Sequence, residues 1–168
     1  MPHPPQGFDE FVVVRRRSLL RTARMLTGDQ HLAEDLVQAA LERVWPRWER
    51  VVQRGDPYAY VRTVMLNLYT AWWRRAWRAE QPTGNLPDVL EAEDDYATTD
   101  LQDAFVRLLS ALSPKQRAIL VLRYHDDLTE VAVAGIMGCS VGTVKSQTAK
   151  ALGKLRYLED PRLAMRDL

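Results

Sequence analysis

The stretch LTEVAVAGIMGCSVGTVKSQTAKALGKLRYL, residues 128–158, predicts two helices joined by a tight turn. Thr129 is a suitable N-cap for a short first helix, and residues 138–140 supply the turn. Ser140 can then cap a longer second helix. The small residue Ala132 allows the two helices to pack closely at a steep angle. This arrangement is typical of a helix-turn-helix.

The longer of these two helices has two contrasting faces. One face carries hydroxyl, amide and ammonium groups and no carboxylate, which suits the major groove. There, small polar groups and glutamine meet base edges, as Gln147 would in pairing with adenine, and lysine meets phosphates. A solvated helix face is also polar, but the turn, the cap and the absence of acids together favour a DNA-reading helix. The opposite stripe is apolar and should be buried; it holds Val144, Ala151, Leu152, Leu155 and Leu158. We expect contacts with DNA from Ser140, Thr143, Lys145, Ser146, Gln147, Lys150 and Lys154.

Further towards the N-terminus, residues 101–127 predict more helix. Ser113 can cap a helix, Pro114 fits its first position, and Gln116 completes a capping box. We therefore place one small helical domain at residues 101–160. The residues before the cap carry an apolar stripe of Leu101, Phe105, Leu108, Leu109 and Leu112.

Residues 8–78 predict a second helical domain. Apolar residues recur at spacings of three and four in three stretches, which begin near Phe8, Leu32 and Tyr58. Pro46 lies inside the second stretch, so that helix must kink or restart there. No segment shows the sustained alternation of a β-strand. The expected fold is all-α, with two small helical domains.

Charge is distributed unevenly along the 168 residues, although the net charge is only +1. Residues 1–78 have a net charge of +5 and residues 107–168 have +4, whereas residues 79–106 carry eight acids and no Lys or Arg. Residues 81–100 also contain two prolines and one glycine, a composition that favours a solvated linker. We place an acidic linker at residues 79–100, between two basic domains.

All five tryptophans lie within residues 45–77, and the last three alternate with arginines. Aromatic faces stack on unpaired bases and arginine neutralises the phosphate backbone, so this pattern is compatible with binding of single-stranded DNA. Some of the tryptophans must instead be core residues, because Trp45, Trp48 and Trp72 fall on apolar stripes. From the cluster alone, core packing and nucleic-acid binding remain equal alternatives.

Four segments together resemble the small sigma factors of the extracytoplasmic-function group of the sigma-70 family. Residues 26–48 resemble the helix that binds RNA polymerase core, including the acidic-Asp-Leu-x-Gln pattern at 34–38. Residues 56–75 resemble the segment that binds the promoter −10 element. Residues 111–129 and 139–156 resemble the opening and the recognition helix of the domain that binds the −35 element. The tryptophan-rich version suggests an actinobacterial branch.

The resemblance implies a sigma factor that directs RNA polymerase to promoters and promotes DNA melting. Its expected partners are the clamp of the polymerase core, promoter DNA and, as a further candidate, an anti-sigma factor. The acidic linker would occupy the RNA path of the polymerase, an inference drawn from its charge. The implied polymerase-binding residues are Glu34, Asp35, Leu36, Gln38 and Glu42. The implied −10 residues are Tyr58, Asn67, Trp72, Trp73, Arg74, Arg75 and Trp77.

The sequence departs from the family pattern in the first helix of the helix-turn-helix. That helix usually begins with Glu-Ile-Ala, often after another Glu, whereas Val131 and Ala132 stand in the places of the two acids here. The reciprocal capping box is therefore lost. The departure leaves the expected fold intact and makes the promoter preference less predictable.

Two other classes of protein are alternatives to a sigma factor. A duplex-binding helix-turn-helix regulator would act without polymerase and would need no aromatic and arginine cluster. An enzyme is disfavoured because His3, His31 and His125 are scattered, and we find no metal-ligand spacing, no phosphate loop, no cofactor site and no nucleophile-base pair. Cys139 is more typical of a packed turn residue than of a reactive thiol.

The expected compartment is the cytoplasm. A single cysteine forms no intramolecular disulfide, which suits a reducing environment. No apolar run approaches the roughly 20 residues of a membrane helix. The first residues, MPHPPQGFDEF, show no basic region followed by an apolar stretch, as a signal peptide would.

Overall fold

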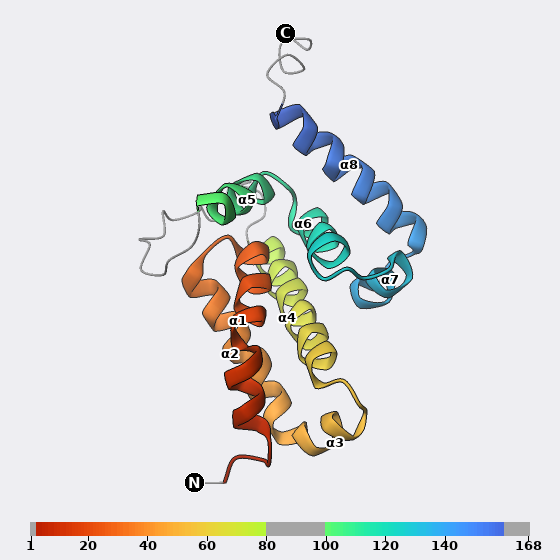
Figure 1. Ribbon diagram of the computed structural model, residues 1–168. Coiled ribbons are helices and arrows are strands. Elements are labelled where there is room, and N and C mark those ends of the chain that lie inside the picture. The colour runs from red at the N-terminus through yellow and green to blue at the C-terminus, as the bar shows by residue number, and fades with distance from the viewer. Residues whose placement is uncertain (1–2, 80–99, 160–168) are drawn as a thin grey trace. The chain divides into compact units, whose positions relative to one another are not determined.

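The structure is a computed structural model that describes residues 3–79 and 100–159, with side chains described at 3–76 and 103–159. The described helices belong to two compact units, α1 to α4 in one and α5 to α8 in the other (Figure 1). Within these residues there is no β-strand, as the all-α prediction requires. The predicted acidic linker lies outside the described residues, apart from its two end positions.

The first unit is a bundle built on three long helices, α1 (Phe8–Thr27), α2 (Gln30–Val44) and α4 (Pro57–Ala79). Helix α2 packs against both α1 and α4, and the three lie side by side in Figure 1. Gly28 ends α1 with a positive φ of 71°, a conformation that glycine adopts without strain. The side chain of Asp29 then accepts a hydrogen bond from the Leu32 amide at 2.8 Å and caps α2.

At Pro46 the helix restarts, which is one of the two outcomes, a kink or a restart, that the sequence allows. Helix α2 gives way to a short 3-10 turn, η1 (Trp45–Arg47), and a new helix, α3 (Trp48–Gln53), follows. Figure 1 shows α3 at one end of the unit, between α2 and α4. The turn allows the indole N–H of Trp48 to donate to the Gln6 carbonyl at 3.0 Å, while the Trp48 ring packs beside Phe8 and Phe11.

The core of the first unit comes mainly from the predicted apolar stripes of its helices, joined by Val51 and Leu66, which the stripes did not include. One polar group inside this core has a partner on another helix: the hydroxyl of Tyr69 donates to the Leu26 carbonyl at 3.0 Å, which links α4 to the end of α1. The fully buried large side chains are Leu19, Leu26, Leu36, Val44, Val51, Val61, Met65 and Leu66.

The described part of the second unit, residues 100–159, contains four α-helices and one π-helical turn. They are α5 (Asp100–Ser110), α6 (Pro114–Leu120), η2 (Val121–His125), α7 (Glu130–Met137) and α8 (Val141–Glu159), and α8 packs against both α6 and α7. The predicted capping box at the start of α6 is present. Ser113 Oγ accepts from the Gln116 amide at 3.3 Å, and Gln116 Oε1 accepts from the Ser113 amide at 3.4 Å.

Arg117 joins α6 to the end of α5. It is only 5% exposed, and its guanidinium donates to the carbonyls of Leu109, Ser110 and Leu112 at 3.0, 3.4 and 3.2 Å. A helix leaves its last C=O groups without partners inside the helix. Here the Leu109 carbonyl also accepts from the amide of Leu112, in the turn after α5, at 3.1 Å. The buried charge therefore serves as a cap from a neighbouring helix.

Three residues expected on apolar stripes are exposed, among them Leu32 at the start of α2, which is 44% exposed. Leu158 is 50% exposed, because the 19 residues of α8 extend further than the eight-residue α7 can cover. Phe105 is 46% exposed, because α5 contributes to the core through its C-terminal end, where Leu109 is buried, and the turn after it buries Leu112. None of the described helices combines the length and the apolar character needed to cross a membrane.

Candidate DNA- and polymerase-binding surfaces

The predicted helix-turn-helix is formed by α7 and α8. Thr129 Oγ1 accepts from the Ala132 amide at 3.1 Å and caps α7. Gly138 ends α7 with a φ of 65°, and its amide donates to the Ala134 carbonyl. Ser140 Oγ accepts from the Thr143 amide at 3.1 Å at the start of α8. The turn and both caps therefore follow from the residue types that the sequence places there.

Helix α8 buries one side and exposes most of the predicted DNA-facing residues. Val144 and Ala151 are buried, whereas Ser140, Lys145, Ser146, Lys150 and Lys154 are exposed and Thr143 and Gln147 are half-buried. The face is not free of acids from other helices. Lys145 Nζ lies 3.9 Å from a carboxylate oxygen of Glu130 on α7. This pair is solvent-exposed, so it holds the lysine only weakly.

Gln147 is not simply a solvated side chain. Its Oε1 accepts a hydrogen bond from Gln116 Nε2 on α6 at 3.2 Å. Gln116 is the same residue that completes the capping box with Ser113. The candidate base-reading amide on α8 is therefore held by a residue 31 positions earlier, a contact that helical periodicity does not reveal.

The aromatic and arginine cluster lies on the C-terminal half of α4. Asn67, Arg74 and Arg75 are exposed, and Trp72 and Trp73 are both half-buried. The Trp73 ring meets the buried Tyr69 ring edge-on, with centroids 6.4 Å apart. Each tryptophan thus combines a packed part and an exposed part, whereas the sequence left core and binding as alternatives. The side chain of Trp77 lies outside the described residues.

Tyr58, predicted as a −10 residue, contacts two arginines. The guanidinium of Arg15 on α1 lies 4.9 Å from the centre of the Tyr58 ring, and that of Arg62 on α4 lies 5.6 Å away. Nearby in the sequence, Arg54 approaches the Tyr60 ring at 6.0 Å. The start of α4 therefore carries a group of cations on aromatic rings. Sequence analysis missed Arg15 because it lies in another helix, 43 positions away.

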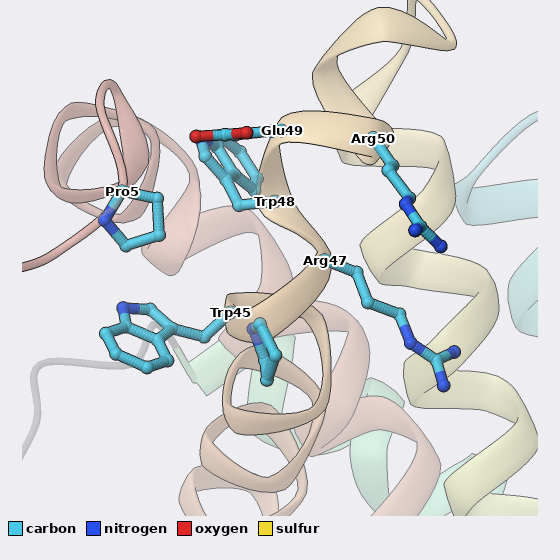
Figure 2. Close-up of a pocket in the computed structure, with 7 residues that line it drawn as sticks. Pro5, Trp45, Arg47, Trp48, Glu49 and Arg50 are labelled. Carbon is cyan, nitrogen blue, oxygen red and sulfur yellow. The ribbon is translucent and has the colours of Figure 1, made fainter. Parts of the chain in front are cut away.

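Two further arginines lie beside α3. A shallow hollow there is lined by Pro5, Trp45, Pro46, Arg47, Trp48, Glu49 and Arg50. Figure 2 shows the ring of Trp45 near Pro5, with Arg47 and Arg50 extending together on the other side of α3. Both arginines are exposed. They add positive charge close to the turn that leads into α4.

Of the five predicted polymerase-binding residues on α2, four lie on its acidic face. Asp35, Gln38 and Glu42 are exposed and Glu34 is half-buried. Glutamines support both glutamates: Gln30 Nε2 donates to Glu34 at 3.2 Å, and Gln38 Nε2 donates to Glu42 at 3.1 Å. The fifth predicted residue, Leu36, does not lie on this face.

Leu36 has an exposed fraction of 0% and lies in the core of the first unit. A side chain without exposed surface makes no contact with a partner protein. The leucine in the Asp-Leu-x-Gln pattern therefore anchors α2 in the bundle, while its neighbours on the helix form the surface.

Comparisons with known families match both units. Residues 12–79 match the family described as Sigma-70 region 2, and residues 102–155 match that described as Sigma-70, region 4. The RNA polymerase sigma-E factor of Streptomyces coelicolor is 40% identical to this chain over 163 residues, which cover 96% of this chain and 88% of that protein. The sigma-E factor of Streptomyces avermitilis is 40% identical over 150 residues, covering 89% and 83% of the two chains. The chain belongs to the extracytoplasmic-function sigma factors of the sigma-70 family.

Solved structures agree with this assignment. The sigma factor RpoE from Bartonella quintana, crystallised with the anti-sigma factor NepR, matches with a TM-score of 0.70 and 27% identity, covering 91% of this chain and 96% of that one. CnrH, solved with the cytosolic domain of CnrY, matches with a TM-score of 0.59, covering 92% and 88% of the two chains. At 21% identity the second match shows the fold alone.

This sigma factor directs RNA polymerase to promoters and binds DNA through its regions 2 and 4. The assignment favours the predicted sigma factor over a regulator that acts without polymerase. The predicted −10 and polymerase-binding residues all fall within the region 2 match, and the predicted −35 residues all fall within the region 4 match. The roles of the individual residues stay predictions.

Proposed function

We propose that this sigma factor works through three surfaces, one for each step of initiation. The acidic face of α2 docks on the polymerase clamp, the C-terminal half of α4 holds the opened −10 element, and the outer face of α8 reads the −35 element. The observation that carries this division is the separation of faces on α8. Its exposed side presents Ser146, Lys150 and Lys154 while Val144 and Ala151 are buried.

The −10 proposal rests on how the aromatic and basic groups of α4 are arranged. Half-buried Trp72 and Trp73 each offer some ring surface from a packed position, and exposed Arg74 and Arg75 follow directly. Unpaired bases stack on such rings, and the guanidinium groups neutralise the backbone beside them. Stacking of extruded bases offsets the free energy lost when they leave the duplex. Arg15 and Arg62, which lie over Tyr58, extend the positive surface to the other end of α4.

The polymerase-docking proposal rests on the charge and exposure of the α2 face. We expect Asp35→Arg to weaken binding to core polymerase about tenfold or more, because it places a like charge against a basic partner surface. Fluorescence anisotropy with purified core polymerase measures the affinity. Asp35 is exposed, so circular dichroism of the variant should be unchanged.

Glu10→Arg is the matched control, because it makes the same charge reversal at an exposed site on α1. Its affinity for core should stay within about twofold of wild type. Equal affinities for wild type and Asp35→Arg would remove the α2 face from the docking surface. Equal losses in both variants would point to overall charge rather than to this face.

An anti-sigma factor is a further proposed partner. Support comes from the Bartonella quintana RpoE, a 27% identical protein whose structure holds the anti-sigma factor NepR. A partner of this kind would compete with core polymerase for the sigma factor. An anti-sigma factor that co-purifies with this chain should therefore dissociate from it when core polymerase is added in excess. Simultaneous binding of both partners would contradict the proposal.

The proposal includes no catalytic step of the sigma factor's own. The homologues are transcription factors, and each of the three surfaces serves binding. We propose that the protein acts in the cytoplasm, where core polymerase and promoter DNA are found.

A further inference from the structure

Three glutamine and serine groups form a chain of hydrogen bonds from α6 to α8. The Ser113 amide donates to Gln116 Oε1 at 3.4 Å, and Gln116 Nε2 donates to Gln147 Oε1 at 3.2 Å. The first bond belongs to a helix cap, and the last group lies on the proposed DNA-reading helix. The chain therefore connects the cap of one helix to a candidate base-reading side chain on another.

The direction of each bond is fixed by the one before it. A backbone amide only donates, so it requires the oxygen of the Gln116 amide to face Ser113. The nitrogen of that amide is then left to face α8, where it requires an acceptor. Gln147 meets this requirement by turning its own oxygen inward. The amide orientation of Gln147 thus follows from the cap of α6.

The consequence is that Gln147 presents its nitrogen rather than its oxygen to the outside. Within the part of the chain that the structure describes, Nε2 of Gln147 donates to no protein acceptor. Paired hydrogen bonds with adenine need both Oε1 and Nε2 to face the base, whereas Oε1 is turned inward to accept from Gln116. An outward amide nitrogen instead matches bases whose exocyclic group in the major groove is an acceptor.

We propose that Gln116 is a specificity-determining residue, which orients Gln147 so that it reads a keto base in the −35 element. Guanine and thymine carry the keto oxygens O6 and O4 in the major groove, whereas adenine and cytosine carry amino groups at N6 and N4. A donor that meets this exocyclic group favours guanine and thymine and is opposed by the amino groups of adenine and cytosine, whereas a contact with N7, an acceptor in both purines, would not distinguish adenine from guanine. This inference rests on the proposed function of α8 and replaces the adenine contact expected from the sequence.

The decisive variant is Gln116→Glu. Glutamate at this capping-box position still accepts from the Ser113 amide, so the cap is retained. Its second oxygen, however, accepts rather than donates, and Gln147 must turn its nitrogen inward to meet it. The outward group becomes Oε1, an acceptor. The preference at one −35 position should then change from guanine or thymine to adenine or cytosine, by about tenfold in relative occupancy.

Gln147→Glu tests directly whether an outward acceptor at position 147 favours an amino base. Its carboxylate accepts from Gln116 with one oxygen and presents the other to DNA, so it should also favour an amino base. The measurement is run-off transcription by the holoenzyme on a promoter library with a randomised −35 element, followed by sequencing. Ala111→Glu, an exposed site in the turn before α6, controls for the added negative charge. It should lower activity on all promoters alike and leave the base preference unchanged.

The possible outcomes distinguish a failure of this inference from a failure of the proposed DNA-reading role of α8. The inference is supported if Gln116→Glu changes the base preference from keto to amino at the same −35 position where Gln147→Ala loses its base preference. If Gln116→Glu keeps the wild-type preference while Gln147→Ala loses it, Gln116 does not orient Gln147, and Gln147 remains a base reader. Unchanged preferences in both variants would remove Gln147 from the reading surface. Adenine as the preferred base of the wild type at that position would also overturn the inference.

Discussion

Arg117 shows how one residue can decide whether a small helical unit holds together. Its buried guanidinium bonds three carbonyls at the end of α5, where the helix dipole also favours positive charge. Across all the described residues, Arg117 and Thr22 are the polar or charged residues classed as buried. Removing the cation would take this donor from the Ser110 and Leu112 carbonyls and leave the Leu109 carbonyl with the Leu112 amide alone. Arg117 therefore maintains the packing of α5 on α6.

We expect Arg117→Met to destabilise region 4 by about 2–4 kcal/mol, because hydrogen bonds to charged groups contribute about 1.5–3 kcal/mol and buried carbonyls lose their partners. Urea denaturation followed by circular dichroism should show an earlier transition for part of the helical signal. Lys115→Met, an exposed change in the same helix, is the control and should shift the transition by less than about 0.5 kcal/mol. An equal midpoint in Arg117→Met and wild type would contradict the role of this residue.

Residue types predicted the caps, but they did not predict contacts between distant side chains. Ser113, Thr129 and Ser140 cap helices as expected, because a cap depends on a few neighbouring residues. The bond between Gln116 and Gln147 and the stacking of Arg15 on Tyr58 depend on how whole helices pack. Neither has a local signal in the sequence. Leu36 was assigned to a surface because the family motif names the residue and not the direction of its side chain.

At the scale of the helices, periodicity predicted more of the structure. All three long helices of the first unit begin where the apolar pattern begins, and Pro46 restarts the chain. The π-helical turn at Val121–His125 was not expected, because its residues continue an ordinary helical pattern until His125. Burial near helix ends was also hard to predict. Leu158 and Phe105 keep the spacing of a buried stripe, yet no neighbouring helix covers them as fully as the stripe implies.

On α8, a side chain that contacts phosphate should change the affinity for DNA without changing the base preference. Lys154 is exposed towards the end of the predicted DNA face, where we expect it to meet a phosphate. Lys154→Ala should weaken binding to all −35 sequences alike and reduce the slope of log affinity against log salt by about one unit. Arg156→Ala is the control, because Arg156 is an exposed cation about 200° further around the same helix. Titrations of the holoenzyme on promoter DNA at several salt concentrations measure both slopes. A changed base preference in Lys154→Ala would show that it reads bases.

On α4, we expect Trp73 to contribute both to packing within the first unit and to DNA melting. Trp73→Ala removes both the ring surface proposed to stack on a base and the contact with Tyr69. We expect slower open-complex formation, since stacking contributes about 1–3 kcal/mol per base, and unchanged binding to core polymerase. Permanganate reactivity of the −10 thymines measures melting. A premelted template should restore most of the activity.

Trp45→Ala serves as the matched control for this variant. Trp45 is also a half-buried tryptophan of the first unit, but it lies beside Pro5 at the α3 hollow rather than on α4 (Figure 2). Both variants lose packing, so their stabilities should fall together while only Trp73→Ala slows melting. Normal permanganate reactivity in Trp73→Ala would mean that the ring has a packing role alone.

At the scale of the whole chain, charge divides the molecule more clearly than composition does. Residues 1–78 and 107–168 are basic, and the 28 residues between them carry eight acids without a single Lys or Arg. The two basic parts contain nearly all of the matches to regions 2 and 4, which bind DNA. An acidic segment between them would be repelled by DNA and attracted by basic channels of the polymerase. This charge pattern motivates the proposal that the segment occupies the RNA path.

Neutralising the acidic segment tests that proposal. Changing Glu91, Glu93, Asp94 and Asp95 to the corresponding amides removes four charges with little change in size. We expect weaker binding to core polymerase at low salt, by about tenfold, and convergence with wild type at high salt, where exposed charges are screened. A segment with the same composition in scrambled order is the control. It should bind as wild type does, because the attraction depends on charge and not on the order of residues. If the amide variant and wild type respond identically to salt, the segment does not lie along a basic surface of the polymerase; if the scrambled segment binds as weakly as the amide variant, the contact depends on specific residues instead of net charge.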